Sequence, residues 1–261
     1  MELFEYIRSL RPKLCLYAFL GVLVFAWHLA GKIGYECMLA GAVLACLTSA
    51  IMAWNDYFDR HHDVKKNRTL ASDNPKTFLA YATTWWIISL LGIVAVYRNN
   101  TQAGWVLVGL AVLGWLYGWF RSVPILSGIV VAVSFGALVP LGAAYSPNAS
   151  WQDVVLLTVC VMLFAFGRET IADLDDVAID RGYKRTLPVV FGADVAKVVV
   201  VIATLVAVGL GVTVSPWVVI LFPFTAGAIW PIARDAARGA KTTLFYDLQT
   251  VGFMVVLVMS A

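Results

Sequence analysis

Long apolar runs recur along the whole chain, separated by short polar or turn-forming segments. The runs are roughly 17 to 25 residues long, which is the length that an α-helix needs to cross the hydrocarbon core of a bilayer. Polar or turn-forming segments interrupt the runs at residues 31–34, 98–102, 122–124, 146–150 and 215–216. We therefore expect about nine membrane-spanning helices, near residues 14–31, 35–54, 77–97, 103–120, 124–145, 152–172, 194–213, 215–233 and 243–261.

The composition favours a membrane protein over a soluble one. Of the 261 residues, 61% are hydrophobic and 13% are charged, and the mean hydropathy is +0.82. A soluble domain carries about 25% charged residues. We do not expect the first apolar run to be a cleaved signal peptide, because many further runs follow it. The four cysteines lie scattered in apolar runs and predict neither disulfides nor a zinc site. The sequence predicts an all-α integral membrane protein with a single domain over residues 1–261.

The basic residues predict how the helices are oriented. With the spans above, all 19 lysines and arginines except Lys32 and Arg98 fall on the side that holds the N-terminus. Loops on the cytoplasmic side of a membrane are enriched in lysine and arginine. We therefore expect a cytoplasmic N-terminus. The short N-terminal segment favours a prokaryotic cytoplasmic membrane.

Two aspartate-rich loops, near residues 55–76 and 173–193, lie on this side of the membrane. Each contains a DxxDxxxD pattern and begins where a predicted span ends. On a helix, the spacing i, i+3, i+7 places three side chains on one face. The first set is Asp56, Asp59 and Asp63, and the second is Asp173, Asp176 and Asp180. The matched spacing indicates one shared site rather than two solvated loops.

Six carboxylates at a membrane edge repel one another and require positive partners. Mg²⁺ prefers oxygen ligands and often bridges carboxylates to substrate phosphates. Basic residues follow both sets, at Lys65, Lys66 and Arg68, and at Lys184 and Arg185. Acids for a metal and bases for phosphate, beside apolar spans, predict an enzyme that binds Mg²⁺ and a prenyl diphosphate at the bilayer surface. We expect no nucleic-acid partner.

In combination, these motifs resemble those of the UbiA superfamily of intramembrane prenyltransferases, and the match covers nearly the whole chain. The family's NDxxDxxxD motif stands at residues 55–63 and its DxxDxxxD motif at residues 173–180. The preceding "FGRETIADLDD" is similar to the family's Arg-Glu element, and "KRTLPVVFG" at 184–192 is typical of the family. The segment "YGWFR" at 117–121 resembles its YxxxK element, with arginine in place of lysine.

The resemblance implies a bundle of nine helices around a central cavity, with Mg²⁺ as cofactor and the active site facing the cytoplasm. The six aspartates would hold Mg²⁺, and Tyr117 would stabilise the allylic cation that forms when the diphosphate leaves. The diphosphate would be bound by Asn55, Arg68, Arg121, Lys184 and Arg185. The roles of His61 and His62 stay open between proton transfer and ordinary loop residues.

Several positions depart from the family's pattern, and they bear on the acceptor. They are Thr69, Asp73, Ser127, Gly128, Ala172 and Ile179. We expect transfer of a prenyl group to an aromatic or lipid-like acceptor. The alternative is a UbiA-type terpene cyclase, in which the prenyl chain attacks its own cation. A transporter is disfavoured because no predicted span carries a charge at its middle. The aspartate motif of CDP-alcohol phosphotransferases is absent.

Overall fold

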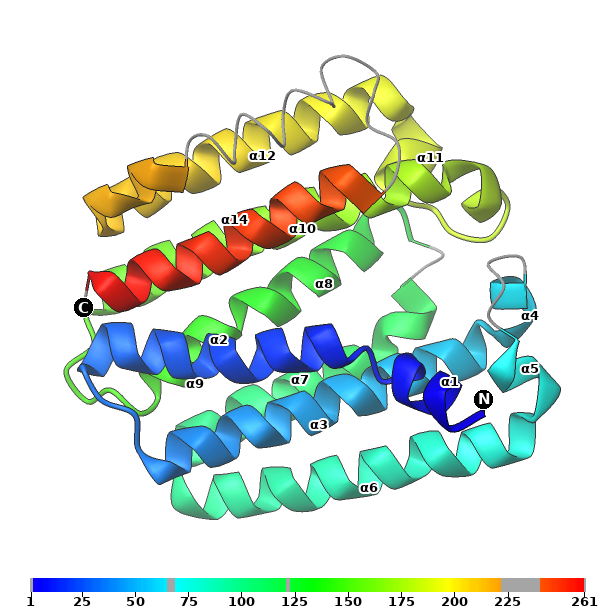
Figure 1. Ribbon diagram of the computed structural model, residues 1–261, viewed down its shortest axis with the longest axis horizontal. Coiled ribbons are helices and arrows are strands. Elements are labelled where there is room, and N and C mark those ends of the chain that lie inside the picture. The colour runs from blue at the N-terminus through cyan, green and yellow to red at the C-terminus, as the bar shows by residue number, and fades with distance from the viewer. Residues whose placement is uncertain (1, 65–68, 121–122, 222–239, 261) are drawn as a thin grey trace.

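The computed structural model describes residues 2–64, 69–120, 123–221 and 240–260. Within these ranges every regular element is a helix, and the long helices run side by side along one axis (Figure 1). The elements are α1 (Glu2–Ser9), α2 (Pro12–Ala30), α3 (Tyr35–Phe58), α4 (Arg60–Asp63), α5 (Leu70–Asp73), α6 (Pro75–Asn99), α7 (Thr101–Phe120), α8 (Leu126–Gly136), α9 (Leu138–Ala143), α10 (Trp151–Asp180), α11 (Leu187–Phe191), α12 (Ala193–Val214), the 3₁₀ helix η2 (Pro216–Leu221) and α14 (Ala240–Met259).

Seven helical segments in the described ranges are long and apolar enough to cross a membrane. They are α2, α3, α6, α7, the pair α8–α9, α10 and α12. The prediction of an all-α, multi-pass membrane protein is therefore confirmed. Of the two remaining predicted spans, 215–233 begins as η2 and continues outside the described residues. The other, 243–261, coincides with α14, whose apolar part is Thr250–Met259.

Proline and glycine set several helix boundaries. Pro12 and Pro75 stand in the first turns of α2 and α6, where a helix does not need their missing N–H groups. Gly31 ends α2 with a φ of 65°, a conformation that glycine adopts without a steric penalty. Gly182 has a φ of 84° and turns the chain directly after α10. Because of this turn, the segment that follows α10 folds back on the end of that helix.

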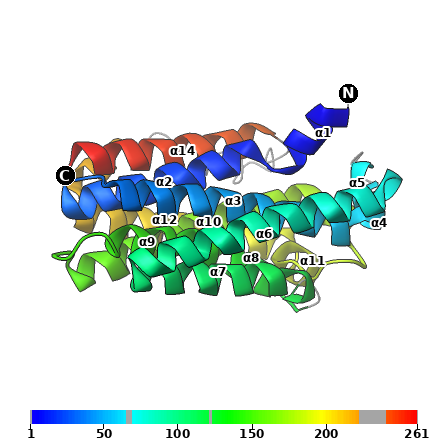
Figure 2. The same cartoon turned by 90° about the horizontal axis from the view of Figure 1, so that it is seen from below.

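One end of the bundle, which we call the aspartate-rich end, carries both acidic motifs. The short helices α4, α5 and α11 lie there with α1, opposite the end at which α14 finishes (Figures 1 and 2). Helix α10 continues past the predicted span end at residue 172 as far as Asp180. The second aspartate set is therefore helical throughout. The first set is divided, because α3 ends at Phe58 and α4 begins at Arg60.

Small residues allow the helices to approach closely. A Cβ atom added to Gly142 of α9 would lie 2.8 Å from the backbone nitrogen of Ala26 in α2. In lipid, where apolar burial does not drive helices together, such close packing supplies much of the association energy. The main buried cluster draws on most of the long helices, and its largest members include Phe25 of α2, Leu47 of α3, Leu107 of α7, Leu141 of α9 and Leu157 of α10. This packed region supports the elements that carry the site.

Candidate active site

The first aspartate set is built where α3 ends. Asn55 and Asp56 lie in the last turn of α3, and Asp59 is the residue that ends it, its N–H donating to the carbonyl of Asn55 at 2.8 Å. Asp63 is the last residue of the one-turn helix α4. Asn55, Asp59 and Asp63 are buried. Burying a carboxylate costs free energy unless a charge or hydrogen bond compensates, so the partners of these groups define the site.

Arg11 is the partner of Asp56. Its Nη2 donates to Oδ1 of Asp56 at 2.9 Å, and both side chains are largely buried. Arg11 joins α1 to α2 in a left-handed conformation with a φ of 54°, which is uncommon for a residue with a side chain. The sequence prediction used Arg11 only for orientation. Arg11, Asp56 and Asp63 line an open pocket of about 410 Å³ together with Glu5, Arg8, Ser9, Thr69, Leu70, Ala71 and Phe78.

The second set occupies the end of α10. Asp173 is repelled electrostatically by Glu169, Asp176 and Asp180, and is attracted by Lys184. Lys184 reaches this position because the turn after α10 brings its backbone N–H to the carbonyl of Asp180, at 3.0 Å. The structure therefore places Lys184 among the second set, as a positive group beside a concentration of carboxylates. This arrangement suits the binding of a metal-bound anion.

Contacts between side chains join the first set to the second. Nε2 of His62 lies 3.2 Å from Oδ1 of Asp180, although the two residues are 118 positions apart. The hydroxyl of Tyr183 donates to Oδ1 of Asp59. The rings of His62 and Tyr183 stack with centroids 4.0 Å apart. The structure thus brings the two sets to one place through His62 and Tyr183. The sequence left the role of His62 open between proton transfer and an ordinary loop residue, and it gave no signal for Tyr183.

The other predicted site residues differ in their position relative to the junction of the two sets. Tyr117, near the end of α7, is partly buried and interacts electrostatically with Glu169, Asp173 and Asp180. Arg185 is exposed, and its carbonyl accepts the backbone N–H of Ile125 at 3.1 Å. The predicted diphosphate ligands Arg68 and Arg121 lie outside the described residues.

The donor chemistry of this site fits Mg²⁺. Among the described residues, no group of three or more histidine, cysteine, aspartate or glutamate side chains is arranged so that it could hold a metal ion. Asp56, Asp59 and Asp180 instead contact protein partners. Carboxylate oxygens are the ligands that Mg²⁺ prefers, and a bound cation would offset the repulsion that Asp173 experiences. The aspartates therefore fit a hard divalent cation for two reasons. They supply carboxylate oxygens as ligands, and they carry a negative charge that a cation would offset.

Comparison with known sequences gives a consistent picture. A family model described as the UbiA prenyltransferase family matches residues 14–250. A digeranylgeranylglyceryl phosphate synthase of Methanopyrus kandleri is 28% identical over 253 residues, which is 94% of this chain and 88% of the relative. A 4-hydroxybenzoate octaprenyltransferase of Yersinia pseudotuberculosis is 27% identical over 129 residues, which is 47% of this chain and 44% of the relative.

Solved structures share the fold. A UbiA homolog of Aeropyrum pernix K1 superimposes with a TM-score of 0.76 at 15% identity, over 95% of this chain and 97% of the other. A UbiA homolog of Archaeoglobus fulgidus bound to GPP and Mg²⁺ gives 0.71 at 15% identity, over 98% of this chain and 99% of the other. The sequence motifs, the helical bundle and the family match over most of the chain lead to one conclusion: this protein belongs to the UbiA prenyltransferase family.

Proposed function

We propose that this protein is a Mg²⁺-dependent intramembrane prenyltransferase. It ionises a prenyl diphosphate and transfers the prenyl group to an aromatic or lipid-like acceptor. The observation that carries the proposal is the junction of the two aspartate sets through His62 and Tyr183. The relatives support it, since one is named for a glyceryl phosphate that bears geranylgeranyl groups and another for the octaprenylation of 4-hydroxybenzoate. A fold neighbour is described with GPP and Mg²⁺ bound.

Different residues of the site would bind the metal and the diphosphate. The six aspartates would hold Mg²⁺, which when bound would stabilise the negative charge on the departing diphosphate. Asn55, Lys184 and Arg185 would bind diphosphate oxygens, and Arg68 and Arg121 would join them from segments outside the described residues. Lys184 is the best supported of these, because it already interacts with Asp173 of the second set.

In the proposed reaction the prenyl group leaves the diphosphate as an allylic cation and then bonds to the acceptor. The allylic C–O bond breaks with both electrons leaving on diphosphate, and a nucleophilic atom of the acceptor then bonds to the allylic carbon and loses a proton. The cation requires surroundings that exclude water. Tyr117 would face it, since an aromatic ring attracts a cation and this ring lies close to the second set.

His62 is a positioning residue in this scheme, because its ring contacts Asp180 and stacks on Tyr183. His61 is exposed and has no part in the scheme. We further propose that the aspartate-rich end faces the cytoplasm of a prokaryotic cell and that residues 1–261 act as a single domain. The concentration of lysine and arginine at this end of the predicted spans supports the orientation.

The test measures diphosphate release by the purified protein in lipid nanodiscs, with prenyl diphosphates of several chain lengths and with Mg²⁺ or a chelator. Organic products are extracted and identified in parallel. We expect release that depends on Mg²⁺ and on an added acceptor, together with a prenylated acceptor. Release without an acceptor, together with a cyclic hydrocarbon or alcohol, would replace the transferase with the terpene cyclase. The absence of release under every condition would contradict both reactions.

A further inference from the structure

A protein cation pairs with one of the predicted Mg²⁺ ligands. Nη2 of Arg11 donates to Oδ1 of Asp56 at 2.9 Å, and the two side chains are 23% and 16% exposed. The contact of Asp59 with Tyr183 is different in kind, because its donor is a phenol. A guanidinium carries a positive charge at every physiological pH. Arg11 and Asp56 therefore form an ion pair through a carboxylate that a bound Mg²⁺ would also require.

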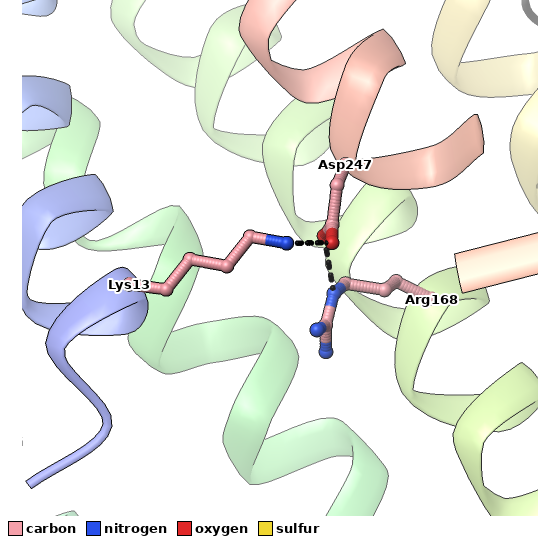
Figure 3. Close-up of polar contacts among 3 residues, drawn as sticks. All are labelled: Lys13, Arg168 and Asp247. Carbon is pink, nitrogen blue, oxygen red and sulfur yellow. Dashed lines mark hydrogen bonds and ion pairs between the residues drawn. The ribbon is translucent and has the colours of Figure 1, made fainter. Parts of the chain in front are cut away.

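The joint between α1 and α2 is anchored on both sides. Towards α1, the ring of Tyr6 packs against that of Tyr81 in α6 with centroids 5.0 Å apart, and the carbonyl of Tyr6 accepts from the Tyr81 hydroxyl at 2.8 Å. Towards α2, Lys13 donates to Asp247 of α14, which also accepts from Arg168 of α10 at 3.2 Å (Figure 3). Because these contacts fix the backbone of the joint, the arginine between them can change partners by rotation of its long side chain.

The pocket beside the ion pair offers the guanidinium a second partner. The pocket has a volume of about 410 Å³, and its lining includes Arg11, Asp56 and Asp63 together with the hydroxyl-bearing residues Ser9 and Thr69. Two of these residues are predicted metal ligands, so the oxygens of a metal-bound diphosphate would lie in or beside the pocket. Guanidinium groups bind phosphate oxygens through paired hydrogen bonds. A phosphate held here is therefore within reach of Arg11.

Arg11 affects the metal and the diphosphate in opposite ways. It opposes the binding of a divalent cation on its own, because the guanidinium occupies Asp56 and repels a like charge. It favours the binding of a cation together with diphosphate, because the phosphate oxygens replace the carboxylate as its partner. The affinity for the metal should therefore be low without diphosphate and high with it, and the same factor must act on the affinity for diphosphate.

We propose that Arg11 couples the binding of Mg²⁺ to that of diphosphate. Arg11 holds Asp56 until both ligands are present, and it then exchanges this carboxylate for a diphosphate oxygen. The proposal rests on the prenyltransferase function proposed above. It adds a residue that lies outside both aspartate motifs, and it explains how the site excludes Mg²⁺ that arrives without a substrate.

The experiment measures the binding of each ligand without the reaction. Purified protein in nanodiscs is titrated with Mn²⁺ as a substitute for Mg²⁺, and electron paramagnetic resonance counts the unbound ion. A second titration uses radiolabelled inorganic diphosphate at a fixed, saturating concentration of free Mg²⁺. We expect Arg11→Met to bind Mn²⁺ alone about tenfold more tightly than wild type, and diphosphate about tenfold more weakly. A residue that only stabilises the fold would not change the two affinities in opposite directions.

Further variants separate charge from structure. Arg11→Lys keeps the positive charge and should retain the weak binding of Mn²⁺ alone. Lys76→Met removes an exposed lysine at the start of α6, at the same end of the bundle, and should leave both affinities unchanged. Arg11→Asn replaces Arg11→Met if the latter does not fold, since asparagine adopts the left-handed conformation of this position more readily.

A thermal measurement gives a second readout. A ligand that binds the folded protein raises its unfolding midpoint in proportion to its affinity. Mn²⁺ alone should therefore raise the midpoint of Arg11→Met by more than it raises that of wild type or of Arg11→Lys. The midpoints without metal show whether each variant is folded.

The outcomes separate this inference from the proposed function. Equal Mn²⁺ affinities in wild type and in the uncharged variants would overturn the coupling and leave the prenyltransferase intact. Weaker binding of both ligands by Arg11→Met would also overturn it, because Arg11 would then act only by holding the site in shape. A failure of the proposed function would instead show as no diphosphate release by wild type from any prenyl diphosphate, with or without an acceptor.

Discussion

Asp59 and Asp180 are carboxylates that are withdrawn from water at the aspartate-rich end. Asp180 is 1% exposed, and Asp59 is also buried. A buried carboxylate depends on its partners for stability. Removal of one partner lowers the free energy of unfolding by more than the pair had contributed to it. Each of these two groups has its partner on the opposite segment of the chain, His62 in one case and Tyr183 in the other. The contacts that assemble the site therefore also stabilise the fold.

We predict that His62→Ala lowers the free energy of unfolding by about 1–3 kcal/mol. The substitution leaves Asp180 without the imidazole and removes the ring that stacks on Tyr183. The measurement is the thermal unfolding midpoint of the purified protein in detergent, compared with that of wild type. His61→Ala alters the neighbouring exposed histidine and should leave the midpoint almost unchanged. Equal midpoints for the two variants would show that the His62 contact stabilises nothing.

The aspartates could be predicted from sequence, but their partners could not. Both motifs are local patterns, so spacing alone revealed Asp56 and Asp173 with their neighbours. Arg11 and Asp56 are 45 positions apart, and Asp59 and Tyr183 are 124 positions apart. Such pairs form only when the helices pack, and no periodicity in one segment encodes them. Arg11 looked like one of many basic residues on its side of the membrane, and Tyr183 like one of ten tyrosines.

At the scale of elements, hydropathy predicted most helices because crossing a bilayer requires a long apolar run. It did not predict where a helix continues into polar sequence. Helix α10 runs through the polar second motif to Asp180, since neither proline nor glycine interrupts it between residues 168 and 181. The apolar pattern of residues 124–145 likewise gave one span, whereas the structure divides it into α8 and α9.

The close contact between α9 and α2 leads to a prediction about packing. Gly142→Ala should lower the free energy of unfolding by about 1–3 kcal/mol, because the new methyl group would meet the backbone of α2 at Val22 and Ala26. Gly109→Ala is the matched control, since a Cβ there meets nothing within 4 Å, and alanine is the better helix former. Thermal unfolding in detergent measures both. A Gly142→Ala protein as stable as the Gly109→Ala protein would contradict the packing of α9 on α2.

At the scale of the whole molecule, the bundle has two unlike ends. The aspartate-rich end holds both motifs and the short helices, and the ends of the described chain lie at opposite ends of the bundle (Figure 1). Spans arranged in this way would separate the charged reaction site from the far side of the membrane. A diphosphate that arrives from water and a prenyl tail that lies in lipid can meet only at such a boundary.

The proposed orientation leads to a labelling prediction. A cysteine introduced by Lys32→Cys, at the end opposite the aspartates, should react with a membrane-impermeant thiol reagent in intact cells. One introduced by Asp73→Cys, at the aspartate-rich end, should react only after the cells are opened. Both variants are made in a protein whose four native cysteines are replaced by serine or alanine. The reverse pattern of labelling would place the active site on the outer face.

We propose that the two aspartate sets act together on one metal-bound diphosphate. The most direct measurement is the Mg²⁺ dependence of diphosphate release by wild type, Asp56→Asn and Asp176→Asn, each with its thermal unfolding midpoint as a check of folding. Either substitution should reduce Mg²⁺-dependent release at least a hundredfold while the protein stays folded. Release at the wild-type rate and with the wild-type Mg²⁺ dependence in either variant would contradict it.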